Sequence, residues 1–267
     1  MNWLALSLGM LAICLPARLA LAADPPMASE LAVAQVIERN VAARGGLPAW
    51  RKIQTMAWIG HIESANHPDA RLSFILEQKR QNKTRFEISR QNLASVRVYD
   101  GKEGWKLRPS ANGTPEVKPY TAEELAFAAD GQGIEGPLMD HAGKGIDVTL
   151  DGMDEVEGRQ SYRLSVKLPS GAVHRIWIDA ETFLDIKYDR QSKDPAGRSA
   201  TLSVFYRDYR NIEGVMVPLT METGIGVMKS PDRMVIDRVV LNPPLDDRSF
   251  ARPHVQGGRH GAIVDTR

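Results

Sequence analysis

Short segments with alternating apolar and polar residues recur along most of this chain, and they limit it to a mainly β fold. In residues 71–79, for example, Leu72, Phe74 and Leu76 alternate with polar or charged residues. A period of two places the apolar side chains of a strand on one side of a sheet. The pattern predicts strands at 53–63, 71–79, 84–89, 95–99, 146–150, 161–168, 173–179, 183–190, 201–210, 215–223 and 234–241, and a hairpin return at 105–107. A mainly β chain of about eleven antiparallel strands must curl or close its sheet.

A few segments have helical features instead. In residues 29–44 the apolar residues recur at helical spacing, Ser29 can cap the start, and Gly45–Gly46 can end the helix. A short helix is predicted at 121–129, which begins with an N-cap threonine, and a second helical piece at 137–142. Helices are thus few, and the sheet carries the fold.

The start of the chain predicts export. An apolar stretch from Trp3 to Leu15 is followed by the small-x-small site Ala20-Leu21-Ala22, after which signal peptidase would cut before Ala23. We therefore expect residues 1–22 to be a cleavable signal peptide and the mature protein to be periplasmic. The alternative is an uncleaved membrane anchor, for which the apolar stretch is short.

Charge and cysteine content exclude several classes of function. The chain has 34 Lys and Arg against 33 Asp and Glu, and removal of residues 1–22 takes away Arg18 and leaves a formally neutral chain. A neutral chain has no electrostatic footprint for nucleic acid. The single cysteine, Cys14, lies in the predicted signal peptide, and Ile13 before it does not suit a lipidation site. Disulfides and cysteine-bound metals are therefore not expected in the mature chain.

Motifs that could support catalysis are weak. Residues 131–136 match a Gly-x-Gly-x-x-Gly pattern, but a helix is predicted before them and Pro137 follows, so we expect a connection and no dinucleotide site. His61 and Glu63 share one side of a predicted strand, which permits an ion pair or a metal contact, but no third ligand is evident. No nucleophile elbow occurs. We expect no catalytic residue, no cofactor and no bound metal.

Large apolar side chains on the predicted strands are the most abundant candidates for function. Most such residues form a protein core. The alternative is that some line a cavity for acyl chains, to which soft methionine side chains are suited. The candidates for such a cavity are Trp58, Phe74, Leu76, Phe86, Ile88, Trp105, Trp177 and Tyr188.

Several segments, in this order, resemble one protein family. They are Ala43–Leu47, Ile53–Gly60, Tyr99–Trp105, Glu135–Asp140, Val156–Leu164 and Ile178–Thr182. Together they resemble the LolA/LolB-like outer-membrane lipoprotein-sorting protein superfamily, over roughly Ser29 to Pro253. The resemblance implies an incomplete antiparallel β-barrel with helices lidding the concave face and an apolar cavity for acyl chains. It gives a LolA-like lipid-binding domain at 23–255 and leaves 256–267 as a disordered tail.

The resemblance also implies the function and the partners. We expect a soluble periplasmic carrier or binding protein for lipids or lipoprotein acyl chains, with envelope membrane proteins as further partners and no nucleic acid. The alternative is a non-carrier module on the same fold that senses or scaffolds other envelope proteins. Glycines and a proline give hinge freedom to the connection at 129–144. The predicted lid residues of this connection are Gly133, Gly136, Pro137 and Leu138, and the alternative is a static loop that covers a filled core.

Overall fold

The computed structural model describes most of the chain after its first residues. The described residues are 31–254, with gaps at 65, 67–70, 91–92, 110–114, 132, 194–195 and 227. The predicted signal peptide at 1–22, the predicted N-cap Ser29 and the predicted tail at 256–267 lie outside these residues. No helix of the described part is both long enough and apolar enough to span a membrane.

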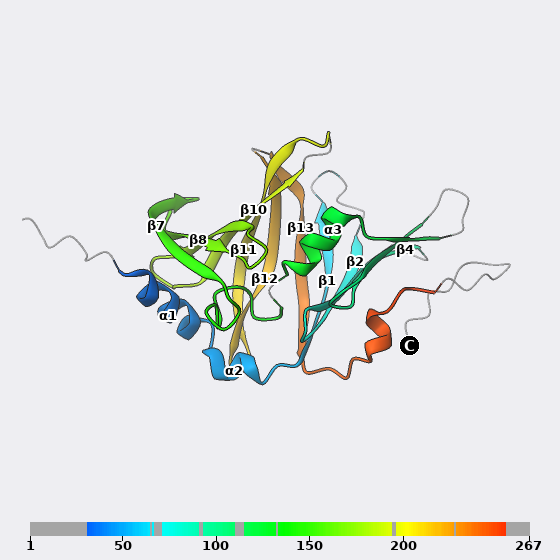
Figure 1. Ribbon diagram of the computed structural model, residues 1–267, viewed down its shortest axis with the longest axis horizontal. Coiled ribbons are helices and arrows are strands. Elements are labelled where there is room, and N and C mark those ends of the chain that lie inside the picture. Colours follow the sequence, from blue (N-terminus) through cyan, green and yellow to red (C-terminus); the bar gives the residue numbers. More distant parts are fainter. Residues whose placement is uncertain are drawn as a thin grey trace, which may run out of the picture. The chain divides into compact units, whose positions relative to one another are not determined.

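One antiparallel sheet of thirteen strands contains most of the described residues (Figure 1). The first half is a meander of β1 (Thr55–Ser64), β2 (Leu72–Lys79), β3 (Lys83–Arg90), β4 (Leu93–Tyr99), β5 (Gly104–Arg108) and β6 (Glu116–Pro119). The second half is a meander of β7 (Asp147–Val156), β8 (Arg159–Lys167), β9 (Val173–Asp179), β10 (Asp185–Lys193), β11 (Ser199–Ile212), β12 (Val215–Ile225) and β13 (Met228–Leu241). The first strand pairs with the last, so the order is β6-β5-β4-β3-β2-β1-β13-β12-β11-β10-β9-β8-β7. The sheet is open, which confirms the predicted incomplete antiparallel barrel.

The strand pattern of the sequence falls short of the sheet in three places, one of which is the start of β13 at Met228 instead of at 234. Strand β6 was not predicted, because it has only four residues and ends in Pro119. Strand β7 continues to Val156 instead of ending at Leu150, because its pairing with β8 shifts register between Leu150 and Gly152. Such a bulge inserts an extra residue and breaks the alternation that marks a strand.

The first two helices are short and precede the strands of the sheet in the sequence. Helix α1 (Val33–Ala43) begins after Ala32 and ends, as predicted, at Gly45–Gly46, where φ is +104° and +81°. A Cβ atom on Gly45 would lie 2.2 Å from the carbonyl oxygen of Gly214, so this close approach requires glycine. Helix α2 (Leu47–Arg51) was not predicted; its Trp50 ring is buried, and the indole N–H donates to the Arg44 carbonyl at 2.8 Å.

Two predictions concern the segment between the two halves of the sheet. Helix α3 (Ala122–Ala129) is confirmed, with Thr121 as N-cap: the Thr121 hydroxyl accepts from the Glu124 N–H, and the Glu124 carboxylate accepts from the Thr121 N–H. The predicted helical piece at 137–142 is wrong, since the chain there forms a series of turns. Positive φ angles at Gly136 and Asp140 are incompatible with a continuous helix.

Candidate functional site

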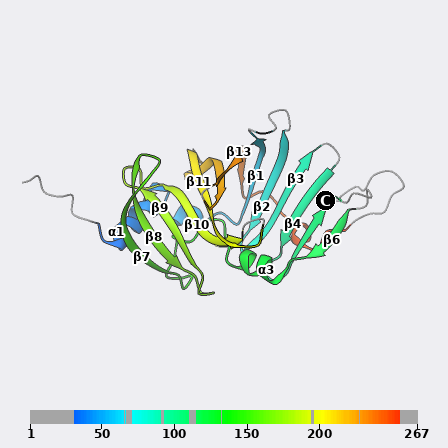
Figure 2. The same ribbon diagram turned by 90° about the horizontal axis from the view of Figure 1, so that it is seen from above.

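Helix α3 lies over the concave side of the sheet, between strands of the first meander and β10 (Figure 2). Its Glu124 carboxylate accepts hydrogen bonds from Arg97 of β4 at 3.1 Å and from Lys106 of β5 at 2.6 Å. Burial disfavours ionisation of Glu124, but the hydrogen bonds from Lys106, from the Thr121 N–H and from Arg97 outweigh it and lower the pKa of Glu124 to about 2. The start of α3 is therefore attached to β4 and β5 by a charged group.

The rest of α3 reaches the other strands. Lys193 of β10 pairs with Glu123 at 3.1 Å, and the Asn82 side chain donates to the carbonyls of Ala128 and Ala129 at the end of the helix. The guanidinium carbon of Arg190, also on β10, lies 3.4 Å from the centre of the Phe127 ring. Helix α3 thus bridges strands that are far apart in the order of the sheet.

Apolar residues make up most of α3, yet none of its residues is buried. Leu125 is half-buried, and Phe127 keeps 47% of its surface exposed. A helix over a filled core normally buries its apolar stripe. Charged and polar contacts therefore hold α3 in place, and it does not pack tightly on the sheet.

The register of the sheet identifies the side chains on the side that carries α3. Residues directly opposite each other in an antiparallel pair point to the same side. Arg97, which contacts α3, pairs with Phe86; Phe86 pairs with Leu76, and Leu76 pairs with Trp58. We call this side the α3 face.

The same reasoning extends the α3 face across the second meander. On β1, Ile62 is on the same side as Trp58, and it pairs with Met234 of β13. Met234 pairs with Met221, and Met221 pairs with Tyr206 of β11. Two residues back on β11, Val204 pairs with Tyr188 of β10 and Leu202 pairs with Arg190. Large, mostly apolar side chains therefore occur on the α3 face of strands from β3 to β10, displaced along the strands between Trp58 and Ile62 and between Tyr206 and Leu202.

Of the residues predicted to line a cavity, Trp58, Phe74, Leu76, Phe86, Ile88 and Tyr188 lie on the α3 face. All of them except Phe74 are half-buried. Phe74 is only 1% exposed, because its ring packs against the Phe86 ring, with 6.0 Å between the ring centres, and covers Gly60. A Cβ atom on Gly60 would lie 2.9 Å from the Phe74 ring. Trp58 packs against the apolar cluster that contains Trp50 and Met56, and the half-buried Leu76, Phe86, Ile88 and Tyr188 keep part of their surface exposed on the α3 face.

Trp105 and Trp177 lie on the opposite side of the sheet. Trp105 precedes Lys106, which contacts α3, and pairs with Val98, so it faces away from the helix. Trp177 pairs with Lys187, whose ammonium lies 4.1 Å from the centre of the indole ring, and its N–H donates to Asp154 at 2.9 Å. Neither can contribute to a binding surface under α3.

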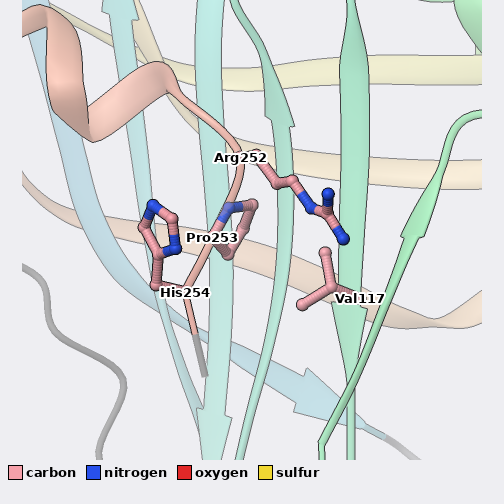
Figure 3. A pocket seen from close by; sticks show the side chains of 4 residues that line it. All are labelled: Val117, Arg252, Pro253 and His254. Atoms are coloured by element: carbon pink, nitrogen blue, oxygen red, sulfur yellow. The ribbon is translucent and has the colours of Figure 1, made fainter. Parts of the chain in front are cut away.

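The opposite side of the first meander is covered by the end of the described chain. Phe250 in the 3₁₀ turn Asp247–Phe250 is fully buried against Val96, Val98 and Leu107. The residues that come after this turn, Arg252, Pro253 and His254, line a pocket of about 350 Å³ together with Val117 of β6 (Figure 3). Its lining is small and mixed in character, so it offers little apolar surface.

The predicted lid segment is firmly tied to the rest of the protein. Leu138 is 1% exposed, and Pro137 is half-buried. Between the positive-φ residues Gly133 and Gly136, the Glu135 carboxylate pairs with Arg80 at 3.1 Å and with Lys144 at 3.0 Å. Its neighbours Ile134 and Met139 are buried with Trp50, Met56, Val215 and Val217 in one apolar cluster. The connection is therefore anchored, and it shares an apolar cluster with Met56, which lies on the same side of β1 as Trp58.

The remaining motifs form no chemical site. His61 contacts Asp237 at 2.9 Å and Glu63 at 3.2 Å, both with ring nitrogens, and Arg71 lies beside it. In the described part of the chain no group of three or more histidine, cysteine or acidic side chains is arranged to hold a metal ion. Residues 131–136 follow α3 and lead into turns, so no helix start is present to receive a pyrophosphate.

Sequence reasoning missed two parts of this site. Phe127 and Arg190 were not selected, although Arg190 follows Tyr188 by two residues and so shares its side of β10. Helix α3 was predicted as an element, but its position over the α3 face depends on contacts with β4, β5 and β10 that no local pattern records.

Solved structures with the same architecture cover most of the chain. A LolA superfamily protein from Nitrosomonas europaea matches 83% of this chain and 98% of its own, with a TM-score of 0.51 and 14% sequence identity. The chain has a LolA-like fold. A DUF1329 family protein from Desulfovibrio piger shares the LolA-like fold over 82% of this chain and 97% of its own, with a TM-score of 0.52 and 14% identity.

A third structure points the same way. A domain from Vibrio parahaemolyticus, described as an outer membrane lipoprotein-sorting protein domain, matches 81% of this chain and 94% of its own, with a TM-score of 0.52 and 12% identity. No protein-family model and no curated protein matches the sequence. At such low identity the likeness establishes the LolA-like fold, and function has to be argued from the site.

Proposed function

We propose that this protein binds the acyl chains of lipids or lipoproteins on the α3 face, in the periplasm, and acts as a soluble carrier or binding protein. One observation carries the proposal: large apolar side chains remain half-exposed beneath a helix that buries none of its own residues. Contiguous exposed apolar surface marks binding sites more often than chance. Burial of an acyl chain there is favoured by the hydrophobic effect.

The chemistry of the α3 face suits a flexible apolar ligand. Trp58, Leu76 and Phe86 offer broad apolar contact, and Met221 and Met234 add unbranched side chains that adapt to variable shapes. The charged groups at the edge of this surface, Arg97, Lys106 and Glu124, neutralise one another. Binding without catalysis is the role that this set of side chains supports.

A matched pair of neighbouring substitutions tests the proposal. Leu76 is half-buried on the α3 face, and Ile75, the preceding residue, is 41% exposed on the other side. Leu76→Gln should weaken binding of a fluorescent fatty-acyl probe about tenfold, because it places an amide among the apolar side chains of the α3 face. Ile75→Gln should leave probe binding unchanged. The measurement is equilibrium titration, with urea unfolding to show that both variants are folded.

Equal probe affinity in the parent and in Leu76→Gln would contradict the assignment of the α3 face. Organic extraction of protein purified from its own periplasm provides an independent check, since a carrier should yield lipid. An extract without lipid, together with no probe binding, would favour the alternative of a sensing or scaffolding module on this fold.

A further inference from the structure

Arg190 differs from the other arginines of the sheet that are not exposed, because no carboxylate of the described residues pairs with it. Two other sheet arginines have such partners: Arg85 contacts Glu87 at 2.7 Å, and Arg97 contacts Glu124 at 3.1 Å. Arg190 is half-buried on the α3 face, and burial lowers its pKa. Partial removal of a cation from water costs free energy when no counter-ion is present, and binding of an anionic ligand would offset that cost.

The contact with Phe127 leaves the Arg190 guanidinium able to bind. One side of the group lies against the Phe127 ring of α3, at 3.4 Å from the ring centre. Stacking on an aromatic face occupies the flat side of a guanidinium, while its N–H groups point outward in the plane. Those N–H groups match the two oxygens of a carboxylate or a phosphate.

Two tyrosines lie near Arg190 on the same face. The Tyr188 hydroxyl contacts the ring nitrogen Nδ1 of His174 at 2.5 Å, and burial lowers the pKa of His174, so the neutral ring can accept a hydrogen bond from that hydroxyl. Tyr206 is close enough to Arg190 and Tyr188 for their charges to act on it, although burial is the largest cause of its raised pKa. Burial likewise raises the pKa of Tyr188 to about 12. Both tyrosines therefore stay neutral at physiological pH, and both remain half-buried and accessible.

We infer that Arg190 and Tyr206 bind the anionic head group, a carboxylate or a phosphate, of an amphiphile whose acyl chain lies on the α3 face. This inference rests on the proposed function. Arg190 supplies charge-assisted hydrogen bonds, and the Tyr206 hydroxyl can donate a further one. Tyr188, fixed by His174, forms the wall of the site. The protein would then select acidic amphiphiles over neutral ones.

The position of Arg190 fits a ligand with a head and a tail. Two steps separate β10 from β12 in the sheet, which corresponds to about 10 Å at the usual strand spacing. Along β11, Tyr206 lies four residues from Leu202, the residue opposite Arg190, and Tyr206 is opposite Met221. A head group at Arg190 leaves the tail to extend past Tyr206 toward Met221 and Met234.

Two acidic residues, Asp185 and Asp130, lie close enough to act on the two tyrosines. Asp185 and Asp130 act electrostatically on Tyr206 and Tyr188 respectively, and Asp185 is paired with Arg44 at 3.5 Å. Asp130 is the C-cap residue of α3. An incoming anion would be the partner of the Arg190 guanidinium.

The test compares two probes that differ only in the head group, a fluorescent fatty acid and the fatty alcohol of the same chain length. The parent protein should bind the acid about tenfold more tightly than the alcohol, the usual size of a charge-assisted hydrogen bond. Arg190→Gln should remove this preference, so that the variant binds the acid and the alcohol with similar affinities. Tyr206→Phe should reduce the preference by a smaller factor. The matched control is Arg175→Gln, an exposed arginine opposite Asp189 on the other side of the sheet, which should change neither affinity.

The outcomes separate this inference from the proposed function. If the parent binds neither probe, the proposed function fails. If it binds both equally and Arg190→Gln changes nothing, acyl binding stands and the head-group site does not. Inorganic phosphate is a third probe: if it stabilises the protein against heating as strongly as the fatty acid does, the site takes free anions, and the head-group assignment is overturned.

Discussion

Phe74 shows that sharing a side of the sheet with a binding surface does not make a residue part of that surface. Its ring is 1% exposed, since it fills the space over Gly60 and packs against Phe86. Its half-buried neighbours Leu76 and Ile88 lie on the same side. Phe74 therefore supports the surface from below, while these neighbours present it.

A substitution at Phe74 should behave as a core substitution. Phe74→Ala should lower the free energy of unfolding by roughly 3–5 kcal/mol, because it leaves a cavity in packed surroundings. Ile75→Ala, at a side chain that is 41% exposed, should change it by less than about 1 kcal/mol. Urea unfolding measures both values. A loss below about 1 kcal/mol for Phe74→Ala would mean that its surroundings are open, and Phe74 would then belong to the binding surface.

Alternation in the sequence assigns residues to sides of a strand but does not say which side the helix covers. For that reason Trp105 and Trp177 were grouped with Trp58, although they lie on the opposite side from α3. The choice between sides depends on contacts such as Glu124 with Arg97 and Lys106. These pairs join residues far apart in the sequence, and no local pattern encodes them.

At the scale of elements, α3 is the least firmly packed part of the site. The Glu124 carboxylate joins its N-cap to two strands, and the helix buries no residue of its own. Elements with few buried apolar contacts open at low free energy. The attachment of α3 should accordingly depend on the charge of Glu124.

The pH dependence of α3 follows from the lowered pKa of Glu124. Its pKa in the folded protein is about 2, below the ordinary value of 4.5, so its stabilising contribution is present above about pH 4.5 and is lost as the pH falls toward 2. The opening free energy of residues 121–129, measured by hydrogen exchange, should therefore fall over that range in the parent. In Glu124→Gln it should be lower at pH 7 and nearly independent of pH.

Glu123→Gln is the matched control for this prediction. Glu123 is one residue earlier and pairs with Lys193, and both side chains are more than half exposed. Exposed pairs contribute little, so this variant should retain the pH dependence of the parent. If both variants behaved alike, Glu124 would have no special part in holding α3.

The sequence predicts most elements of this fold but not the geometry of their junctions. Eleven strands and the helices at α1 and α3 follow from residue periodicity and capping. Strand β6 is too short to show an alternating pattern, and the bulge at Gly152 interrupts the alternation in β7. The turns around Glu135 depend on its ion pairs with Arg80 and Lys144, which lie elsewhere in the chain. Long-range ion pairs and register shifts account for each of these differences.

At the scale of the whole molecule, the signal peptide expected at residues 1–22 predicts export from the cytoplasm. When the full chain is expressed in a Gram-negative host, the mature protein should begin at Ala23 and fractionate with soluble periplasmic contents. Mass spectrometry of the purified protein gives the N-terminus. Replacing both Ala20 and Ala22 by leucine should block cleavage and retain the protein in the membrane fraction. An intact N-terminus in the membrane fraction of the parent would support the uncleaved anchor.

The pairing of the first strand with the last has a consequence for the time at which this protein can fold. Met56 of β1 lies opposite Leu241 of β13, while each meander on either side is built from hairpins between consecutive strands. Each hairpin can form as soon as its own residues are free to fold. The middle of the sheet is completed only after β13 is available, and contacts of such long sequence separation form slowly. Until then the apolar side chains on β1 to β3 lack their continuation on β11 to β13, so the incomplete chain passes through a stage that is prone to aggregation.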